Sequence, residues 1–424
     1  MISFFDLFAV LILLTAAFGW VNRKFFGLPS NIELLLMGVL SSLLLVGIDR
    51  AIPGANLLAD FGSALAKIDF YDAVMNGMLA FLLFAGALHV DWQRLKRRFG
   101  SVTALATLGV VLSTFIIGAG FWLLAGLFGL NLPLPWALVF GALISPTDPV
   151  AVLSMLKSTR VPELLETEIA GESLFNDGVG VVLFTLLLTI AASGDTDFSV
   201  LSVVGIFLLE AIGGALFGLL AGYVAFQAMR LIDDYAVEIF ISLALVTTTY
   251  ALARHAHISG PIAVVVAGLL IGERGPTHAM SERTQRYLFG FWTVVDEILN
   301  SILFLLIGLE LLVLDFKLEF GGLALCMIPL VLLARLAAIG IPITILSAWV
   351  RFVTGSIPVM VWGGIRGGIS IALALSIPYG DERAVILTAT YAVVLFTIIV
   401  QGLTMPAVIR QSVPSAKIKS ARRN

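Results

Sequence analysis

Charged residues are scarce in this 424-residue sequence, at 12% of the chain, and cysteine and histidine are scarcer still. A soluble globular chain carries about 25% charged residues, so the composition excludes a soluble enzyme and a disordered regulator. The net charge of −3 excludes the basic face of a nucleic-acid-binding domain, and no nucleic acid is expected as a partner. The single cysteine, Cys326, excludes a disulfide framework and a CxxC zinc site.

Apolar residues, in contrast, make up 59% of the chain, and the mean hydropathy is +1.05. A helix needs about 20 apolar residues to cross the hydrocarbon core of a bilayer. The sequence therefore predicts an all-α polytopic membrane protein, with residues 1–424 forming one integral membrane transport domain in the lipid bilayer. About 13 transmembrane helices are expected over 3–20, 30–48, 72–90, 101–128, 135–156, 166–192, 199–229, 235–253, 258–272, 289–314, 320–348, 353–378 and 383–409.

The distribution of basic residues orients these spans. Cytoplasmic loops are enriched in Lys and Arg. With the C-terminus inside and the N-terminus outside, 18 of the 25 Lys and Arg residues fall in inner segments and five in outer loops. The first span lacks the basic start and the cleavage site of a signal peptide. We therefore expect a multi-pass protein of the cell (inner) membrane, ending in a short basic cytoplasmic tail over 411–424.

Motifs for phosphate binding and for hydrolysis are also missing. The sequence contains no GxxxxGK[ST], HExxH or GxSxG pattern, so no ATPase or common hydrolase is indicated, and no cofactor is expected. One enzyme class stays open, the intramembrane aspartyl proteases, because two membrane carboxylates that share a proton can activate water. Otherwise an ion gradient supplies the energy, which indicates a secondary transporter or a channel.

The fifth span contains the motif ISPTDP, in which Pro146 and Pro149 flank Thr147 and Asp148. Two prolines three residues apart remove two amide donors and disfavour a continuous helix. Broken backbone at membrane depth is tolerated only where protein or a water-filled cavity satisfies it. The alternative is a simple proline kink, but a carboxylate between the prolines favours a break that binds a cation.

The sixth span contains GESLFND, with four polar side chains in an apolar helix. Ser173 and Asp177 are four residues apart, as are Glu172 and Asn176, so the four side chains share one flank of the helix. Hydroxyl, amide and carboxylate oxygens on this flank are ligands suited to a hard monovalent cation.

Two arginines, Arg335 and Arg366, fall well inside spans eleven and twelve. The four glycines around Arg366, in GGIRGG, predict either unwinding or close helix packing. Spans five and twelve are an odd number of spans apart and therefore run in opposite directions. Paired interrupted helices of this kind indicate an inverted repeat and a binding site near the bilayer midplane.

Together the motifs ISPTDP, GESLFND, LARLAAIG and GGIRGGI, in this order, resemble the electroneutral monovalent cation/proton antiporters of the NhaP and sodium–proton exchanger type. The similarity begins at FLLFAGALHV near residue 81 and ends near 378. It implies inverted repeats with two broken crossing helices, a homodimer, and elevator-like movement. In that movement a six-helix ion-translocating core (101–192 and 320–409) shifts against dimerisation and scaffold helices (1–90 and 199–314).

The resemblance also implies which residues bind the ions. Asp177 would bind either the cation or the proton, and Na⁺ would be held by Asp177, Thr147 and Ser173. Asp148 would balance the half-helix dipoles at the crossing, and Asn176 would brace the unwound part of span five.

Further residues would hold this core together without carrying ions. Glu172 and Arg335 would form a structural ion pair. Arg366, Pro146 and Pro149 would support the broken helices.

One position departs from the family pattern. Some relatives have an acidic ligand in the third span, where this chain has Ala85. His89, one turn later, is a possible substitute, although a histidine there is more often interfacial.

The predicted mechanism is competition at one carboxylate. Burial favours the protonated form and a bound cation favours the ionised form, so proton and cation exclude each other. Because residue 176 is Asn and Glu172 is expected to be held by Arg335, one carboxylate titrates, which predicts electroneutral exchange of one Na⁺ or Li⁺ for one H⁺. K⁺/H⁺ exchange by the same fold, a channel, and a protease using Asp148 and Asp177 stay open as alternatives.

Overall fold

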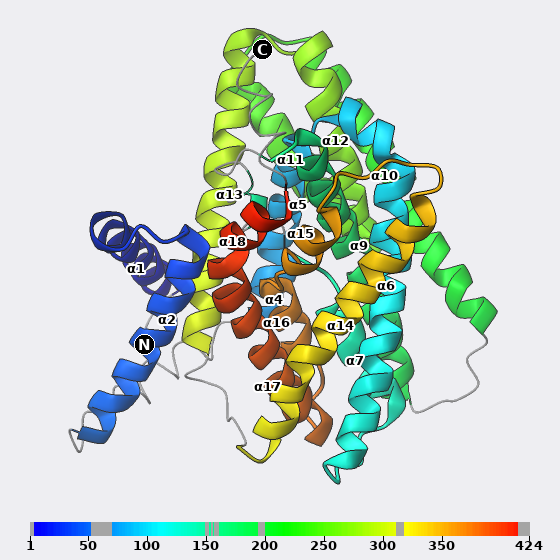
Figure 1. The fold of residues 1–424 in the computed structure, drawn as a ribbon. Coiled ribbons are helices and arrows are strands. Elements are labelled where there is room, and N and C mark those ends of the chain that lie inside the picture. Colours follow the sequence, from blue (N-terminus) through cyan, green and yellow to red (C-terminus); the bar gives the residue numbers. More distant parts are fainter. Residues whose placement is uncertain are drawn as a thin grey trace.

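The computed structural model describes residues 4–51, 70–148, 152–153, 156, 161–193, 200–310 and 318–413. Within these ranges every regular element is a helix (Figure 1). The α-helices are α1 Phe4–Phe25, α2 Ser30–Ala51, α4 Phe70–Asp72, α5 Leu79–Leu88, α6 Trp92–Leu127, α7 Leu134–Ile144, α9 Glu163–Ser193, α10 Val200–Arg230, α11 Tyr235–His255, α12 Gly260–His278, α13 Glu282–Glu310, α14 Gly321–Leu346, α15 Ser356–Trp362, α16 Gly368–Leu375, α17 Asp381–Phe396 and α18 Gly402–Ser412. Two π-helical turns, η1 Ala73–Met78 and η3 Thr397–Gln401, join α4 to α5 and α17 to α18, and η2 Leu318–Phe320 is a short 3₁₀-helix.

Each predicted apolar stretch coincides with one of these helices or with a run of them, and the predicted all-α fold is confirmed. In the described part of the chain, nine helical segments have the length and apolar composition to cross a membrane. The basic tail lies outside the described residues beyond 413.

Helix α6 begins earlier than the predicted start at 101. The Asp91 carboxylate caps it by accepting a hydrogen bond from the amide of Arg94 (3.1 Å). A cap of this kind satisfies an amide that the helix cannot satisfy itself. The basic residues of 94–98 therefore extend the helix rather than precede it.

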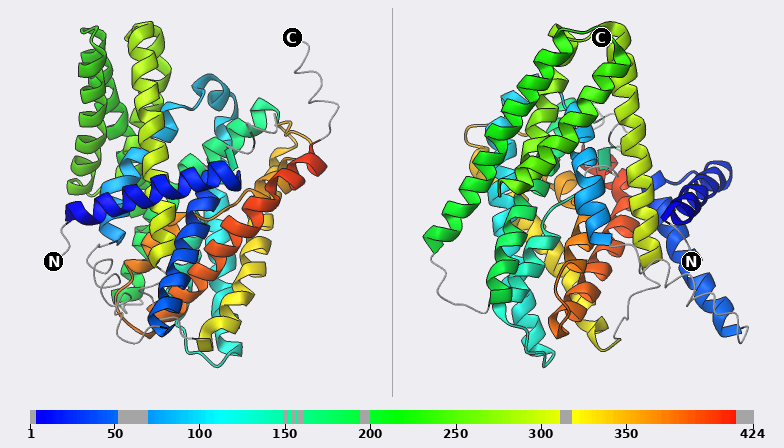
Figure 2. Two further views of the ribbon diagram at one scale, coloured as in Figure 1. Left: turned by 90° about the vertical axis from the view of Figure 1, so that its left-hand side faces the viewer. Right: turned by 180° about the vertical axis from the view of Figure 1, so that it is seen from behind.

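Helix α1 lies across its neighbours rather than along them (Figure 2). It packs on α2 and α13, and it exposes large apolar side chains, among them Leu13, Trp20 and Phe25. That this segment crosses the membrane therefore stays a prediction.

The remaining helices pack in two neighbouring sets. In one set α6 packs on α7, α9 and α14, while α17 packs on α14 and α16. In the other, α12 packs on α5, α10 and α11, and α13 packs on α2 and α5. A second cluster of buried side chains fills this latter set around Trp292.

Glycines bring the two sets close together. A Cβ at Gly178 of α9 would lie 2.7 Å from Ile262 of α12, and one at Gly368 of α16 would lie 2.5 Å from Leu303 of α13. Larger side chains at these positions would push the two sets apart. The residue that precedes Gly178 is Asp177, so this seam runs directly beside the predicted ion ligand.

Both interruptions predicted from proline and glycine are present among the described residues. Helix α7 ends at Ile144, and residues 146–148 are not helical. Helix α15 ends at Trp362, and α16 begins at Gly368, so residues 363–367 separate two half-helices. Pro149 lies outside the described residues, whereas Pro146 lies within the first break.

Candidate ion-binding site

The two broken segments meet through their backbones. The amide of Asp148 donates a hydrogen bond to the carbonyl of Ile365 over 2.8 Å. A Cβ at Gly367 would lie 2.5 Å from Asp148 Oδ2 and 2.7 Å from its Cβ, so only glycine fits there. The Asp148 carboxyl group thus lies beside the N-terminal end of α16, where the helix carries a partial positive charge.

Arg366 makes the reciprocal contact from the second break. Its Nη1 donates to the carbonyls of Ser145 and Pro146, the latter over 2.9 Å, and its side chain is 0% exposed. These carbonyls follow the C-terminal end of α7, which carries a partial negative charge. Asp148 from the first break therefore faces the positive end of α16, and Arg366 from the second break faces the negative end of α7.

The polar flank of α9 faces the first break. Asn176 Nδ2 donates to Thr147 Oγ1 over 2.8 Å, and the amide of Thr147 donates to Asn176 Oδ1 over 3.3 Å. The hydroxyl oxygens of Thr147 and Ser173 are 3.1 Å apart. A Cβ at Gly180, one turn along, would overlap the ring of Pro146, so α9 contacts the break without a gap. The arrangement presents two hydroxyl oxygens at one buried point.

Glu172 and Arg335 form a bidentate ion pair behind these hydroxyls. The two Nη atoms donate to the two carboxylate oxygens over 2.7 and 2.8 Å, and both side chains are buried. Paired geometry of this kind is the strongest available to a guanidinium group. Asn176 Nδ2 also donates to Glu172 Oε1 over 2.9 Å, which connects the ion pair to the first break.

Asp177 differs from the other charged groups of the site. Its side chain is 7% exposed, and no hydrogen bond or salt bridge reaches its carboxylate from the described part of the chain. Two further carboxyl groups, those of Asp148 and Glu172, are close enough to interact with it electrostatically. An ionised carboxylate without a partner is costly to bury, so this group needs a cation or a proton.

Summed over the described residues of the site, the formal charges leave one excess negative charge. Asp148 and Glu172 are acidic, Arg335 and Arg366 are basic, and these four formal charges cancel. Asp177 is the fifth charged group, and one monovalent cation or one proton neutralises the set.

The third-span position contributes no acidic ligand. Ala85 is buried in α5, and His89 at the end of that helix is exposed. His89 Nδ1 donates to the carbonyl of Ala85 over 2.7 Å, and its Nε2 lies 3.1 Å from Thr293 Oγ1 of α13. His89 therefore links two helices of the second set, and the contacts of both ring nitrogens are with those helices.

Some buried polar groups near the site are not apparent from the sequence motifs. Thr114 Oγ1 of α6 lies 3.3 Å from Ser145 Oγ, beside the first break. Glu168, one turn before Glu172 in α9, is 0% exposed, with Arg98 Nε 3.6 Å from its carboxylate. The only signal for Glu168 is its spacing of four residues from Glu172 in GESLFND.

The chain is similar in sequence and in fold to known proteins. The family model for the transmembrane sodium/hydrogen exchanger matches residues 10–411. The chain is 44% identical to a Na⁺/H⁺ antiporter, NhaP, of Pseudomonas aeruginosa, over 96% of each chain, and 39% identical to the NhaH antiporter of Halobacillus aidingensis, over 87% of this chain and 91% of the relative. The structure of the sodium proton antiporter MjNhaP1 from Methanocaldococcus jannaschii has the same fold, with a TM-score of 0.72 at 19% identity, over 95% of this chain and 97% of that one. This multi-pass membrane protein therefore belongs to the sodium/hydrogen exchanger family.

Proposed function

We propose that this chain is a secondary antiporter that exchanges one Na⁺ or Li⁺ for one H⁺ without moving net charge. The observation that carries the proposal is the Asp177 carboxylate, which no hydrogen bond or salt bridge reaches from the described residues, beside four other charged groups whose formal charges cancel. In the cation-loaded form, the hydroxyl oxygens of Thr147 and Ser173 lie within the same polar cluster and supply further ligands. In the proton-loaded form, Asp177 is a neutral acid.

Coupling follows from competition at this one group. A proton on Asp177 removes the negative charge that attracts the cation, and a bound cation disfavours the proton. The loaded site carries the same total charge with either ion, so a cycle moves no net charge. Membrane voltage then has no direct effect on the driving force, since the cost of moving a charge across the potential scales with that charge.

Alternating access is proposed to be an elevator-like movement of the core (101–192 and 320–409) against the scaffold. This proposal is supported by the hydrogen bonds of the site, which among the described residues join the two breaks, α9 and α14, all within 101–192 and 320–409. The movement would take place along the contact between the two sets, where Gly178 and Gly368 pack closely on Ile262 and Leu303.

The resemblance further suggests assembly and orientation. We place the protein in the cell membrane as a homodimer joined through scaffold helices of 1–90 and 199–314, with the N-terminus outside and the C-terminus in the cytoplasm. The apolar side chains that α1 and α10 expose, such as Trp20 and Leu216, are compatible with a partner or with lipid on these helices.

Proton flux in liposomes tests the proposed function. We expect a Na⁺ gradient to drive proton movement in the opposite direction, at a rate that does not change when the membrane potential is clamped at zero or at a large negative value. The measurement uses purified protein reconstituted into liposomes that contain a pH-sensitive dye, with each alkali cation added in turn.

The same assay decides among the alternatives. Proton flux that depends on voltage would contradict one-for-one exchange, and flux driven by K⁺ alone would replace Na⁺ with K⁺ as the substrate. Saturable cation flux without any proton movement would contradict antiport and favour a channel.

A further inference from the structure

In the second broken helix, residues 363–367 lack regular helical hydrogen bonds, so their amides and carbonyls need other partners at membrane depth, where no bulk water is available. Within the break, the amide of Gly364 donates to Val361, and Ile365 donates to Gly363. Other elements also bond to backbone groups at and beside the break. Arg335 of α14 donates to the carbonyl of Met360 over 3.4 Å.

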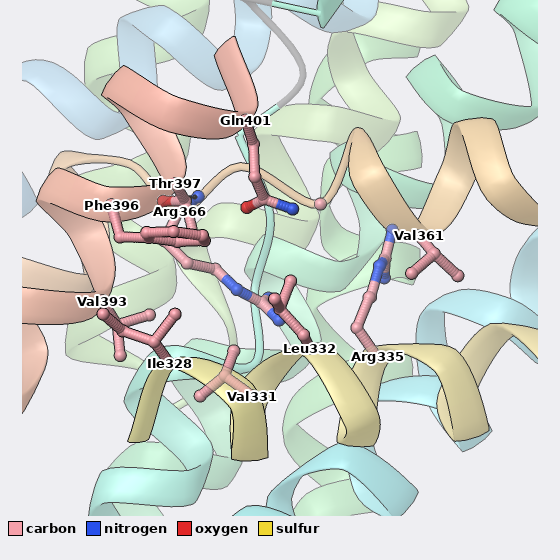
Figure 3. Close-up of a pocket in the computed structure, with 11 residues that line it drawn as sticks. Ile328, Val331, Leu332, Arg335, Val361, Arg366, Val393, Phe396, Thr397 and Gln401 are labelled. Carbon is pink, nitrogen blue, oxygen red and sulfur yellow. Dashed lines mark hydrogen bonds between the residues drawn. The ribbon is translucent and has the colours of Figure 1, made fainter. Parts of the chain in front are cut away.

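Two backbone groups that flank residues 363–365, called here the two edges of the break, are satisfied by one helix, the last span. Thr397 Oγ1 accepts a hydrogen bond from the amide of Arg366 over 3.1 Å. Gln401 Nε2 donates to the carbonyl of Trp362, the last residue of α15, over 3.1 Å. Thr397 and Gln401 are both buried, and Figure 3 shows them reaching from the same helix toward the segment that carries Arg366.

These two residues are the first and last residues of the π-helical turn η3. The turn interrupts an otherwise continuous helix over Asp381–Ser412. π-Helical turns are rare and are found frequently at functional sites. Here the irregular turn of the last span lies against the irregular segment of the second broken helix.

The space between these groups is narrow. Thr397, Gln401, Arg366 and Arg335 border it together with apolar side chains (Figure 3). It is too tight to admit a water molecule. Among the described residues, Arg366 Nε and Nη2 have no hydrogen-bond partner.

We infer that Thr397 and Gln401 are positioning residues for ion exchange, an inference that rests on the proposed function. They hold the two edges of the break at a fixed separation. This places Arg366 on the free end of α7, and it places the carbonyl of Ile365 on the amide of Asp148. The geometry of the cation site in the first break is thereby set from the last span, although neither residue contacts the ion.

The test uses isosteric changes with a matched control. In Thr397→Val the acceptor for the Arg366 amide is lost at nearly constant volume, and in Gln401→Met the donor to Trp362 is lost. We expect the KM for Na⁺ to rise about tenfold in each, because a buried group loses its hydrogen bond, and Thr397→Ser to restore the wild-type KM. Thr390→Val is the control, since the buried Thr390 hydroxyl donates only to Ile386 in its own helix.

A second readout does not depend on transport. Hydrogen–deuterium exchange of the segment 363–368, measured in nanodiscs, should be at least about fivefold faster in Thr397→Val than in wild type or Thr397→Ser. Unchanged exchange in Thr397→Val, or an equal rise of KM in Thr390→Val, would overturn the inference. If wild-type protein moves no protons with Na⁺, the proposed function fails, while the deuterium exchange still decides whether Thr397 holds the break.

Discussion

Replacing Asp177 with asparagine should abolish Na⁺-driven proton movement in proteoliposomes. The amide has almost the shape of the carboxyl group, but it is neutral and carries no exchangeable acidic proton. The variant therefore loses both the negative charge that binds Na⁺ and the group that carries H⁺. Because the attraction between two close, buried opposite charges is worth about 3 kcal/mol or more, we expect the exchange rate to fall at least about a hundredfold.

The matched control for this variant is Glu168→Gln. Glu168 is a buried carboxyl group on the same helix, but it contacts Arg98 rather than the break. Its replacement by glutamine is equally isosteric. We expect its exchange rate to stay close to that of wild type. Exchange that persists in Asp177→Asn would remove Asp177 from the ion-carrying role, and equal loss in both variants would show that α9 tolerates no such change anywhere.

The second large effect should be on stability, at the ion pair of Glu172 and Arg335. Glu172→Ala leaves the Arg335 guanidinium buried without its carboxylate partner, a loss that costs about 3–5 kcal/mol. We expect a clear fall in the temperature of thermal unfolding in detergent. Replacing both residues, as in Glu172→Ala with Arg335→Met, should restore much of that temperature, because no uncompensated charge is left.

The ion pair also has a second contact that the double variant does not restore. Asn176 Nδ2 loses its acceptor on Glu172 in both the single and the double variant. The loss of this Asn176 contact is therefore common to both variants and does not contribute to the difference between their unfolding temperatures. Equal temperatures for the single and double variants would refute a structural role for the pair.

The positions of the broken helices could be predicted from sequence because proline and glycine act locally. Pro146 removes an amide within the turn that it occupies, and α7 ends two residues before it. The glycines around Arg366 also act locally, and α15 and α16 are separated at the position where these glycines indicate unwinding or close packing. Both effects are present, since Gly367 is also pressed against Asp148.

The supporting contacts could not be predicted, because they join residues far apart in the chain. Thr397 and Gln401 lie in the run TIIVQ, and nothing in that run indicates a π-helical turn or a partner near residue 366. The contact of Glu168 with Arg98 depends on α6 beginning at Trp92, because Arg98 then lies within a helix that packs on α9. Hydropathy alone placed the start of that span later, at the end of its basic residues.

The most direct test of competition at a single carboxylate is to count ions on purified protein. Calorimetry in weakly buffered detergent solution measures Na⁺ bound and protons released in the same titration. Where Asp177 starts protonated, each Na⁺ that binds should displace one proton, and Asp177→Asn should show neither signal. The account would be contradicted if Na⁺ bound to the wild-type protein and released no proton at every pH tested.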